Sequence, residues 1–203
     1  MTAEAIVDTT QALRVRLETA VGANQVYIGP PLTNEVGQRR VALFLFHVEP
    51  NRDLRNVEHL IPAPGAPDDP HIPANALPLD LRFLISVFRL PAADGAVPNE
   101  LNALGEIIQV LHAEPTLGGG LLRGQQVRLT PEPYPMEELS RVWGLFPQTV
   151  FRTSIVYLAS PVFVWTGPSP RGRPVVRKEE RWGLSLEPPD LFGDRREREG
   201  AVR

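Results

Sequence analysis

Cysteine is absent from this chain of 203 residues, and the absence removes several classes of protein at once. Without thiols there is neither a disulfide framework nor a thiolate metal site, and no cysteine can act as a nucleophile. A chain without disulfides is suited to the reducing cytoplasm. We therefore expect the protein to fold and assemble there.

A strong net charge and long apolar runs are also missing. The net charge is -3 and the isoelectric point is near 5.8, so the chain lacks the basic surface that nucleic acid requires. The first 20 residues carry Glu4, Asp8 and Glu18, unlike the apolar centre of a signal peptide. No run approaches the roughly 20 apolar residues of a membrane span. We expect no nucleic-acid partner, no membrane partner and no export signal.

Motifs for catalysis are equally scarce. The histidines form no HExxH pair, and Ser154 and Ser160 lie in no GxSxG elbow. The glycines at 118–120 are followed by leucines instead of the GK[ST] of a phosphate-binding loop. The sequence therefore predicts no catalytic residues, no cofactor and no small-molecule substrate.

One loop segment keeps an enzymatic alternative open. Asp68, Asp69 and His71 are residue types that hold divalent cations, and a small metal-dependent hydrolase would have to be built on them. The other interpretation is a solvated turn rich in proline and aspartate. We favour the turn and predict no metal site.

Proline is abundant, with 22 copies, and it separates the periodic segments from one another. Spacings of three, four and seven predict an amphipathic helix over 3–21, a second from Asn99 to before Pro115, and a third opening at Pro135. That third helix should bury Met136, Leu139, Trp143 and Phe146. Apolar and alternating runs predict strands at 26–28, 41–48, 77–87, 127–130, 150–158 and 162–165.

Two strands carry further expectations. The strand at 41–48 is apolar on both alternating sets, which predicts cover on both faces and a buried His47. The strand from Leu77 has apolar odd positions and places Asp80, Arg82 and Ser86 on its other face, which predicts cover on one face. Between them, 51–75 should be a long polar connection stiffened by proline.

The composition changes near Ser169. From there to the end, nine Lys or Arg and seven Asp or Glu accompany few periodic apolar residues. Independent folding of such a segment is not expected. We predict one domain, residues 1–168, followed by a charged extension, residues 169–203, that is flexible or ordered by a partner.

Several stretches, in order over most of residues 1–166, resemble the N-terminal domain of cap proteins from extracellular contractile injection systems, the phage-tail-like particles that bacteria release. They are Asp8–Leu13, Leu45–Asn51 with Leu54–Asn56, Leu77–Leu84, Glu100–Gly105 with Val110–His112, and Glu138–Trp143. The resemblance implies an α+β fold, with a mixed, mainly antiparallel sheet flanked by helices as in phage tail terminators.

The resemblance also implies a function. A hexameric ring of copies would cover the end of the inner tube, contact the last tube and sheath subunits and stop elongation. A tail terminator or completion protein of a phage or of a secretion-type system is the alternative that the same fold would serve. In either case the protein is expected to be a structural part of a particle that is assembled in the cytoplasm and, for the injection systems, released.

The predicted contact residues come from the matching stretches: Pro50, Asn51, Leu54, Arg55, Asn56 and Arg141. Loops stiffened by proline lose less entropy on docking than flexible loops, which favours a contact role for the proline-rich segment from Asn51 to Asn75. The alternative, that Pro50 and Asn51 only form a tight turn after a strand, carries equal weight at this point.

Overall fold

The computed structural model describes residues 4–57, 59–61, 72–88 and 99–168, all within one unit, Met1–Ser169. Its elements in chain order are α1 (Ala5–Val21), β1 (Val26–Ile28), α2 (Thr33–Val36), β2 (Val41–Pro50), β3 (His59–Ile61), β4 (Ile72–Val87), α3 (Asn99–Ala113), β5 (Thr116–Leu117), the 3-10 helix η1 (Gly120–Leu122), β6 (Val127–Glu132), α4 (Met136–Trp143) and β7 (Ser154–Pro168). The predicted C-terminal extension lies outside the described residues. None of the described helices has the length and apolarity to cross a membrane.

The described strands form one seven-stranded sheet. Its order is β1-β2-β4-β7-β6-β5, and β3 pairs with β4 beside this path. Strand β1 runs parallel to β2, whereas the other neighbouring strands are antiparallel. The sheet is thus mixed and mainly antiparallel, and with helices against it the predicted α+β class is confirmed.

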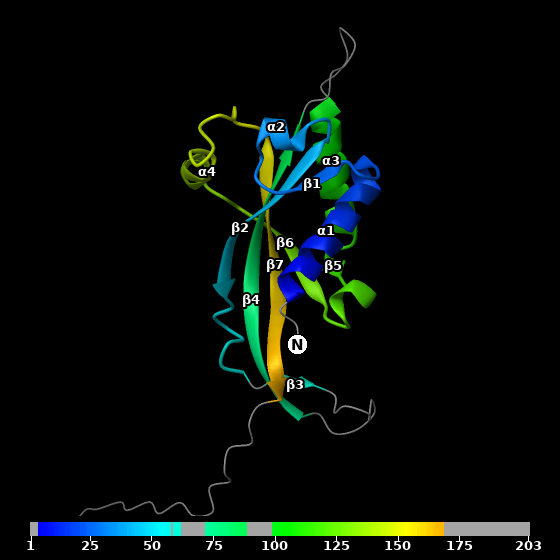
Figure 1. Ribbon diagram of the computed structural model, residues 1–203, viewed down its shortest axis with the longest axis vertical. Coiled ribbons are helices and arrows are strands. Elements are labelled where there is room, and N and C mark those ends of the chain that lie inside the picture. The colour runs from blue at the N-terminus through cyan, green and yellow to red at the C-terminus, as the bar shows by residue number, and fades with distance from the viewer. Residues whose placement is uncertain (1–3, 58, 62–71, 89–98, 169–203) are drawn as a thin grey trace, which may run out of the picture. The chain divides into compact units, whose positions relative to one another are not determined.

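Helices α1 and α3 cover one face of the sheet (Figure 1). Leu13 and Leu17 of α1 are four residues apart, so they lie on the same face of the helix. Both point toward the sheet and are fully buried. They meet the odd-numbered side chains of β4, among which Leu81 and Phe83 are fully buried as well. The main hydrophobic core therefore lies between these two helices and the sheet.

Helix α4 covers part of the opposite face (Figure 1). Its Leu139 and Trp143 pack on Leu84 of β4 and Val156 of β7, so the predicted core position of Trp143 is confirmed. The expectation that β4 is covered on one face only is wrong for its second half, because α4 returns over Leu84. A single-strand pattern does not reveal which later segment folds back onto it.

Two predicted boundaries need correction. The connection 51–75 contains β3, and β4 already begins at Ile72, because residues 72–74 pair with β3 in spite of Pro73. Residues 62–71, with the acidic loop segment, lie outside the described residues. Strand β7 begins at Ser154 instead of Val150, since the ring of Phe151 packs on Trp143, with 5.3 Å between their centroids. It continues to Pro168, so the two strands predicted at 150–158 and 162–165 are one.

Two side chains expected in the core are exposed. His47 lies beyond the part of β2 that α4 covers, so its prediction as a buried residue is wrong. Met136 is 67% exposed because it occupies the first position of α4, before the helix meets the sheet. Both errors arise where an apolar pattern runs past the end of a packed surface.

Candidate functional site

The turn after β2 contains five of the six predicted contact residues. Pro50 is the last residue of the strand, and Asn51 to Asn56 follow as the turn. Arg55 and Asn56 are exposed, whereas Asn51 and Leu54 are partly buried. The described structure thus brings these five together on one segment, which we call the β2 turn, residues 50–57.

Asn51 anchors the β2 turn. Its Nδ2 donates to Oδ1 of Asp80 at 2.8 Å and to Oγ of Ser160 at 3.2 Å, while its Oδ1 accepts from the backbone N–H of Leu54 at 2.9 Å. The Ser160 hydroxyl also donates to Asp80 Oδ1, at 2.5 Å. An asparagine that bonds its own following backbone forms an Asx-type turn. The side chain of Asn51 therefore has a structural role, and the exposed Arg55 and Asn56 are the part of the turn that is available for contacts.

The sixth predicted residue, Arg141, lies elsewhere. It is exposed on α4, where it pairs with Glu137 one helical turn earlier at 2.7 Å. Helix α4 packs on Leu84, whereas Pro50 at the β2 turn pairs with Leu79, five residues back along β4. Arg141 and the β2 turn are therefore separate surfaces.

Sequence reasoning missed a charged network on the α4 side of the sheet, beyond the area that α4 covers. Arg82 of β4 donates to Glu49 of β2 at 2.6 Å and, through two nitrogens, to Glu132 of β6 at 2.8 and 3.1 Å. His47 Nδ1 lies 3.1 Å from the same guanidinium. The polar residues at even positions of β4 indicated that Arg82 lies on this face. Its partners Glu49 and Glu132 belong to β2 and β6, and only the strand order and register bring them near Arg82.

Within this network, the charges of Arg82 and Glu49 stabilise each other. The hydrogen bond and charge of the Arg82 guanidinium hold the pKa of the Glu49 carboxyl below its ordinary value. In return, hydrogen bonding to Glu132, and then to Glu49, raises the pKa of Arg82. Both shifts favour the charged forms, so Glu49 and Arg82 stay ionised at neutral pH. The ion pairs of Arg82 thus link three strands of the sheet, β2, β4 and β6.

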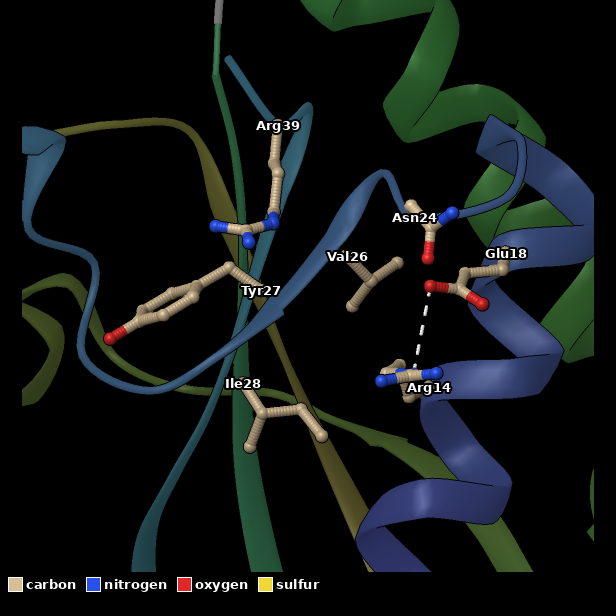
Figure 2. Close-up of a pocket in the computed structure, with 7 residues that line it drawn as sticks. All are labelled: Arg14, Glu18, Asn24, Val26, Tyr27, Ile28 and Arg39. Carbon is tan, nitrogen blue, oxygen red and sulfur yellow. Dashed lines mark ion pairs between the residues drawn. The ribbon is translucent and has the colours of Figure 1, made fainter. Parts of the chain in front are cut away.

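A cavity of about 330 Å³ lies at the free edge of β1. Figure 2 shows residues from both sides of this edge strand, with Tyr27 and Arg39 on one side and Arg14 and Glu18 of α1 on the other, near Asn24. Arg14 Nε lies 3.6 Å from Glu18 Oε1. The charged side chains that line the cavity already have partners: Arg14 faces Glu18, and Arg39 lies over the Tyr27 ring.

The chemistry of this cavity does not indicate catalysis. The hydroxyl of Tyr27 donates to the Glu35 carboxylate, and this bond raises the pKa of Tyr27, which keeps the phenol protonated. The guanidinium of Arg39 lies over the Tyr27 ring, 5.6 Å from its centroid. In the part of the chain that the structure describes, no three His, Asp or Glu side chains are grouped as metal ligands would be.

The chain belongs to the Pvc16 N-terminal domain family, whose profile matches residues 8–178. A comparison with curated proteins finds no match. The family assignment confirms the resemblance that the sequence stretches indicated.

Two solved structures have a similar fold. One is described as a sheath/tube terminator of an extracellular contractile injection system, PVC, in its extended state, with a TM-score of 0.56 and 15% identity over 90% of this chain. The other is described as the tube-terminating cap of the anti-feeding prophage, with a TM-score of 0.59 and 15% identity over 86% of this chain. This chain spans 65% and 60% of the lengths of those two proteins.

Proposed function

We propose that this protein is a cap of a contractile injection particle: a non-enzymatic assembly protein that binds as a ring to the end of the inner tube and sheath and stops their elongation. The observation that carries the proposal is the fold, because the two similar structures are described as a terminator and as a terminating cap. Membership of the Pvc16 N-terminal domain family supports it.

A cap needs two unlike surfaces, one that binds the open end of the tube and one that binds no further subunit. A tube of rings stacked head to tail grows without limit unless a subunit matches the open rim without recreating it. In this chain the two ends of β2 differ. One leads into the exposed β2 turn, and the other adjoins the β1 cavity with its paired charges. Such unlike ends suit a subunit that binds a rim on one side only.

Under this proposal the β2 turn contacts a tube or neighbouring subunit. Its backbone is already held, since Arg55 N donates to Asn51 O at 3.1 Å and Asn51 N donates to Pro78 O at 2.9 Å. A segment ordered before binding loses little conformational entropy on docking. Arg55 and Asn56 supply exposed polar groups for that contact. Arg141 on α4 would belong to a second contact area.

The proposed partners are copies of the same chain, as a hexameric ring, and the inner tube and sheath subunits. Assembly would take place in the cytoplasm, and the finished particle would carry the protein outside the cell. The charged extension, residues 169–203, is proposed to become ordered on one of these partners. Neither nucleic acid nor membrane has a role in this scheme.

Direct binding to tube ends tests the proposal. Purified protein carrying a gold label is mixed with preassembled tubes that have open ends, and labelled positions are recorded by electron microscopy. We expect label at one end of each tube and arrested elongation when free tube subunits are added. Label distributed along the tube wall, or unchanged elongation, would refute a capping role.

The role of the β2 turn is tested separately with Arg55→Ala. We expect this variant to fold normally and to bind tube ends several-fold more weakly, because the exposed guanidinium is lost from the contact. Arg39→Ala is the matched control, since it removes an exposed arginine at the opposite end of β2. If Arg55→Ala caps tubes as well as the wild type does, the β2 turn has no contact role and only connects two parts of the chain.

A further inference from the structure

The connection from α4 to β7 exposes three large apolar side chains. Leu145, Val150 and Phe151 are 71%, 74% and 48% exposed. Most soluble surfaces do not gather side chains of this kind, and such groups mark contact sites. We call these three residues the α4 knob.

Aromatic contacts fix Phe151 of the α4 knob in place. The Trp143 ring contacts Phe151 at 5.3 Å and Phe146 at 6.3 Å between centroids. The backbone of the connection closes on itself, because Thr149 N donates to Phe146 O at 3.0 Å. A preorganised apolar projection backed by aromatic rings has the properties of an interface anchor.

A cavity with a mainly apolar lining lies on the other side of the sheet. It has a volume of about 320 Å³ and lies between the C-terminal half of α3 and the strands β6 and β7. Most of its lining is apolar: Ile108, Leu111, Pro115, Leu129, Pro131, Ile155 and Tyr157, with His112, Arg128 and Thr130 as the polar members. We call this cavity the α3 groove. Its volume is near the lower limit for ligand pockets, so a few side chains fill it better than a cofactor would.

The rim of the α3 groove continues along the helix. Ile108 is 39% exposed and Leu101, seven residues earlier, is 54% exposed. Residues seven apart lie on the same side of a helix, about 10 Å from each other. Gly105 lies between them and leaves open space where a side chain would project. Helix α3 therefore has an outward apolar stripe in addition to the stripe that it buries.

A protein cannot place its own α4 knob in its own α3 groove, because the sheet separates them. Trp143, which backs the knob, packs on Val156, whereas the neighbouring residues Ile155 and Tyr157 line the groove. Successive side chains of a strand point to opposite faces. Knob and groove thus lie at the same end of β7 but on opposite faces, and only another molecule can join them.

We infer that the α4 knob of one copy inserts into the α3 groove of the next copy, and that this contact builds the ring. The inference rests on the proposed function, which requires a ring. A contact between two different surfaces of the same chain is heterologous and closes into a ring when the rotation between copies is suitable. A standard interface buries roughly 800 Å² on each partner, so the knob would form its apolar centre.

Complementary variants test the contact. Val150→Asp damages the knob and leaves the groove intact, whereas Ile108→Asp damages the groove and leaves the knob intact; neither side chain is in the core. We expect each variant alone to lose the ring-sized species in light scattering coupled to size exclusion. Their equimolar mixture should form a heterodimer that grows no further, because it retains one intact contact.

Leu121→Asp is the control, since Leu121 is 53% exposed on η1 and belongs to neither surface. It should form rings as the wild type does. If Val150→Asp and Ile108→Asp also form normal rings, or if their mixture stays monomeric, the inference is overturned. Those results would leave tube capping by the wild type untouched, so the inference and the proposed function can fail separately.

Disulfide trapping provides a second measurement, because the chain has no native cysteine. A variant with both Val150→Cys and Ile108→Cys should form covalent dimers and higher multimers on oxidation of assembled rings. The matched pair Val150→Cys and Leu121→Cys should not. Absence of multimers from the first pair, or equal multimers from both, would contradict the knob-in-groove contact.

Discussion

Along β4, odd-numbered and even-numbered side chains point to opposite faces of the sheet and meet different surroundings. The odd residues Leu81, Phe83 and Ile85 are fully buried under α1 and α3. Among the even residues, Leu84 lies under α4, but Arg82 joins a partly exposed charged network. One face is thus a continuous apolar core, and the other combines a small core with a polar area.

The two faces of the sheet therefore have different roles: the face under α1 and α3 provides stability, and the other face keeps polar groups at the surface. Apolar burial on the first face provides most of the free energy of folding, since it scales with the area removed from water. The second face contributes less burial and keeps charged and hydrogen-bonded groups near solvent. Substitutions on the first face should therefore lower the free energy of unfolding strongly, and substitutions on the second face should lower it less.

The largest effect is expected from Phe83→Ala on the first face. Removing a fully buried aromatic side chain leaves a cavity and costs about 3–5 kcal/mol of unfolding free energy. Urea denaturation followed by tryptophan fluorescence measures the loss. A cost below about 1 kcal/mol would show that the core of the first face is less tightly packed than its burial indicates.

Arg82→Met tests the adjacent position on the second face. Without the guanidinium, Glu49 and Glu132 lose a shared partner, and we expect a loss of about 1–3 kcal/mol at neutral pH. Arg128→Met, which changes an exposed arginine of β6, is the control and should stay within about 0.5 kcal/mol of the wild type. Equal effects of the two variants would contradict a specific role for the network.

Asn51→Ala should cost about 1 kcal/mol, because the turn loses its side-chain acceptor and the link to Asp80. Asn56→Ala, at an exposed position of the same turn, is the matched control and should be neutral. Chemical denaturation of the two variants side by side measures the difference. If Asn56→Ala is the more damaging change, the assignment of the anchor is wrong.

The smallest effect is a pH dependence. Arg82 lowers the pKa of Glu49 from 4.5, so the native state binds fewer protons than the unfolded state in mild acid. The stabilising contribution is complete above the unfolded pKa and is lost as the pH falls through the lower folded pKa. Wild-type stability should therefore decline more than that of Arg82→Met on acidification, as measured by urea midpoints. Parallel declines would contradict the coupling.

The sequence predicted the first face of the sheet well and the second face poorly. Alternation at Leu79 to Val87 is a local signal, so the buried odd positions and the strand itself were predictable. Cover of Leu84 by α4 and pairing of Arg82 with Glu132 depend on which distant segments come together. Strands β3 and β5 were not predicted, because β3 lies in the connection that was expected to be a loop and β5 has only two residues.

The contact role of the candidate site stays a prediction, and the structure shows only how its residues are arranged. The resemblance selected the segment around Asn51 and Arg55, and the structure places it as one ordered turn. It did not distinguish the anchoring Asn51 from the exposed Arg55, because that difference lies in the side-chain bonds to Asp80 and Ser160. The knob and the groove had no sequence signal, since their exposed leucine, valine and isoleucine resemble core residues until the packing is known.

The length of the particle tests the central claim most directly. Particles assembled with and without this protein are purified, and their tube and sheath lengths are measured by electron microscopy. The account predicts uniform lengths with the protein, and a broad distribution with unsealed ends when it is deleted. Uniform, sealed particles in its absence would contradict a role in ending the tube.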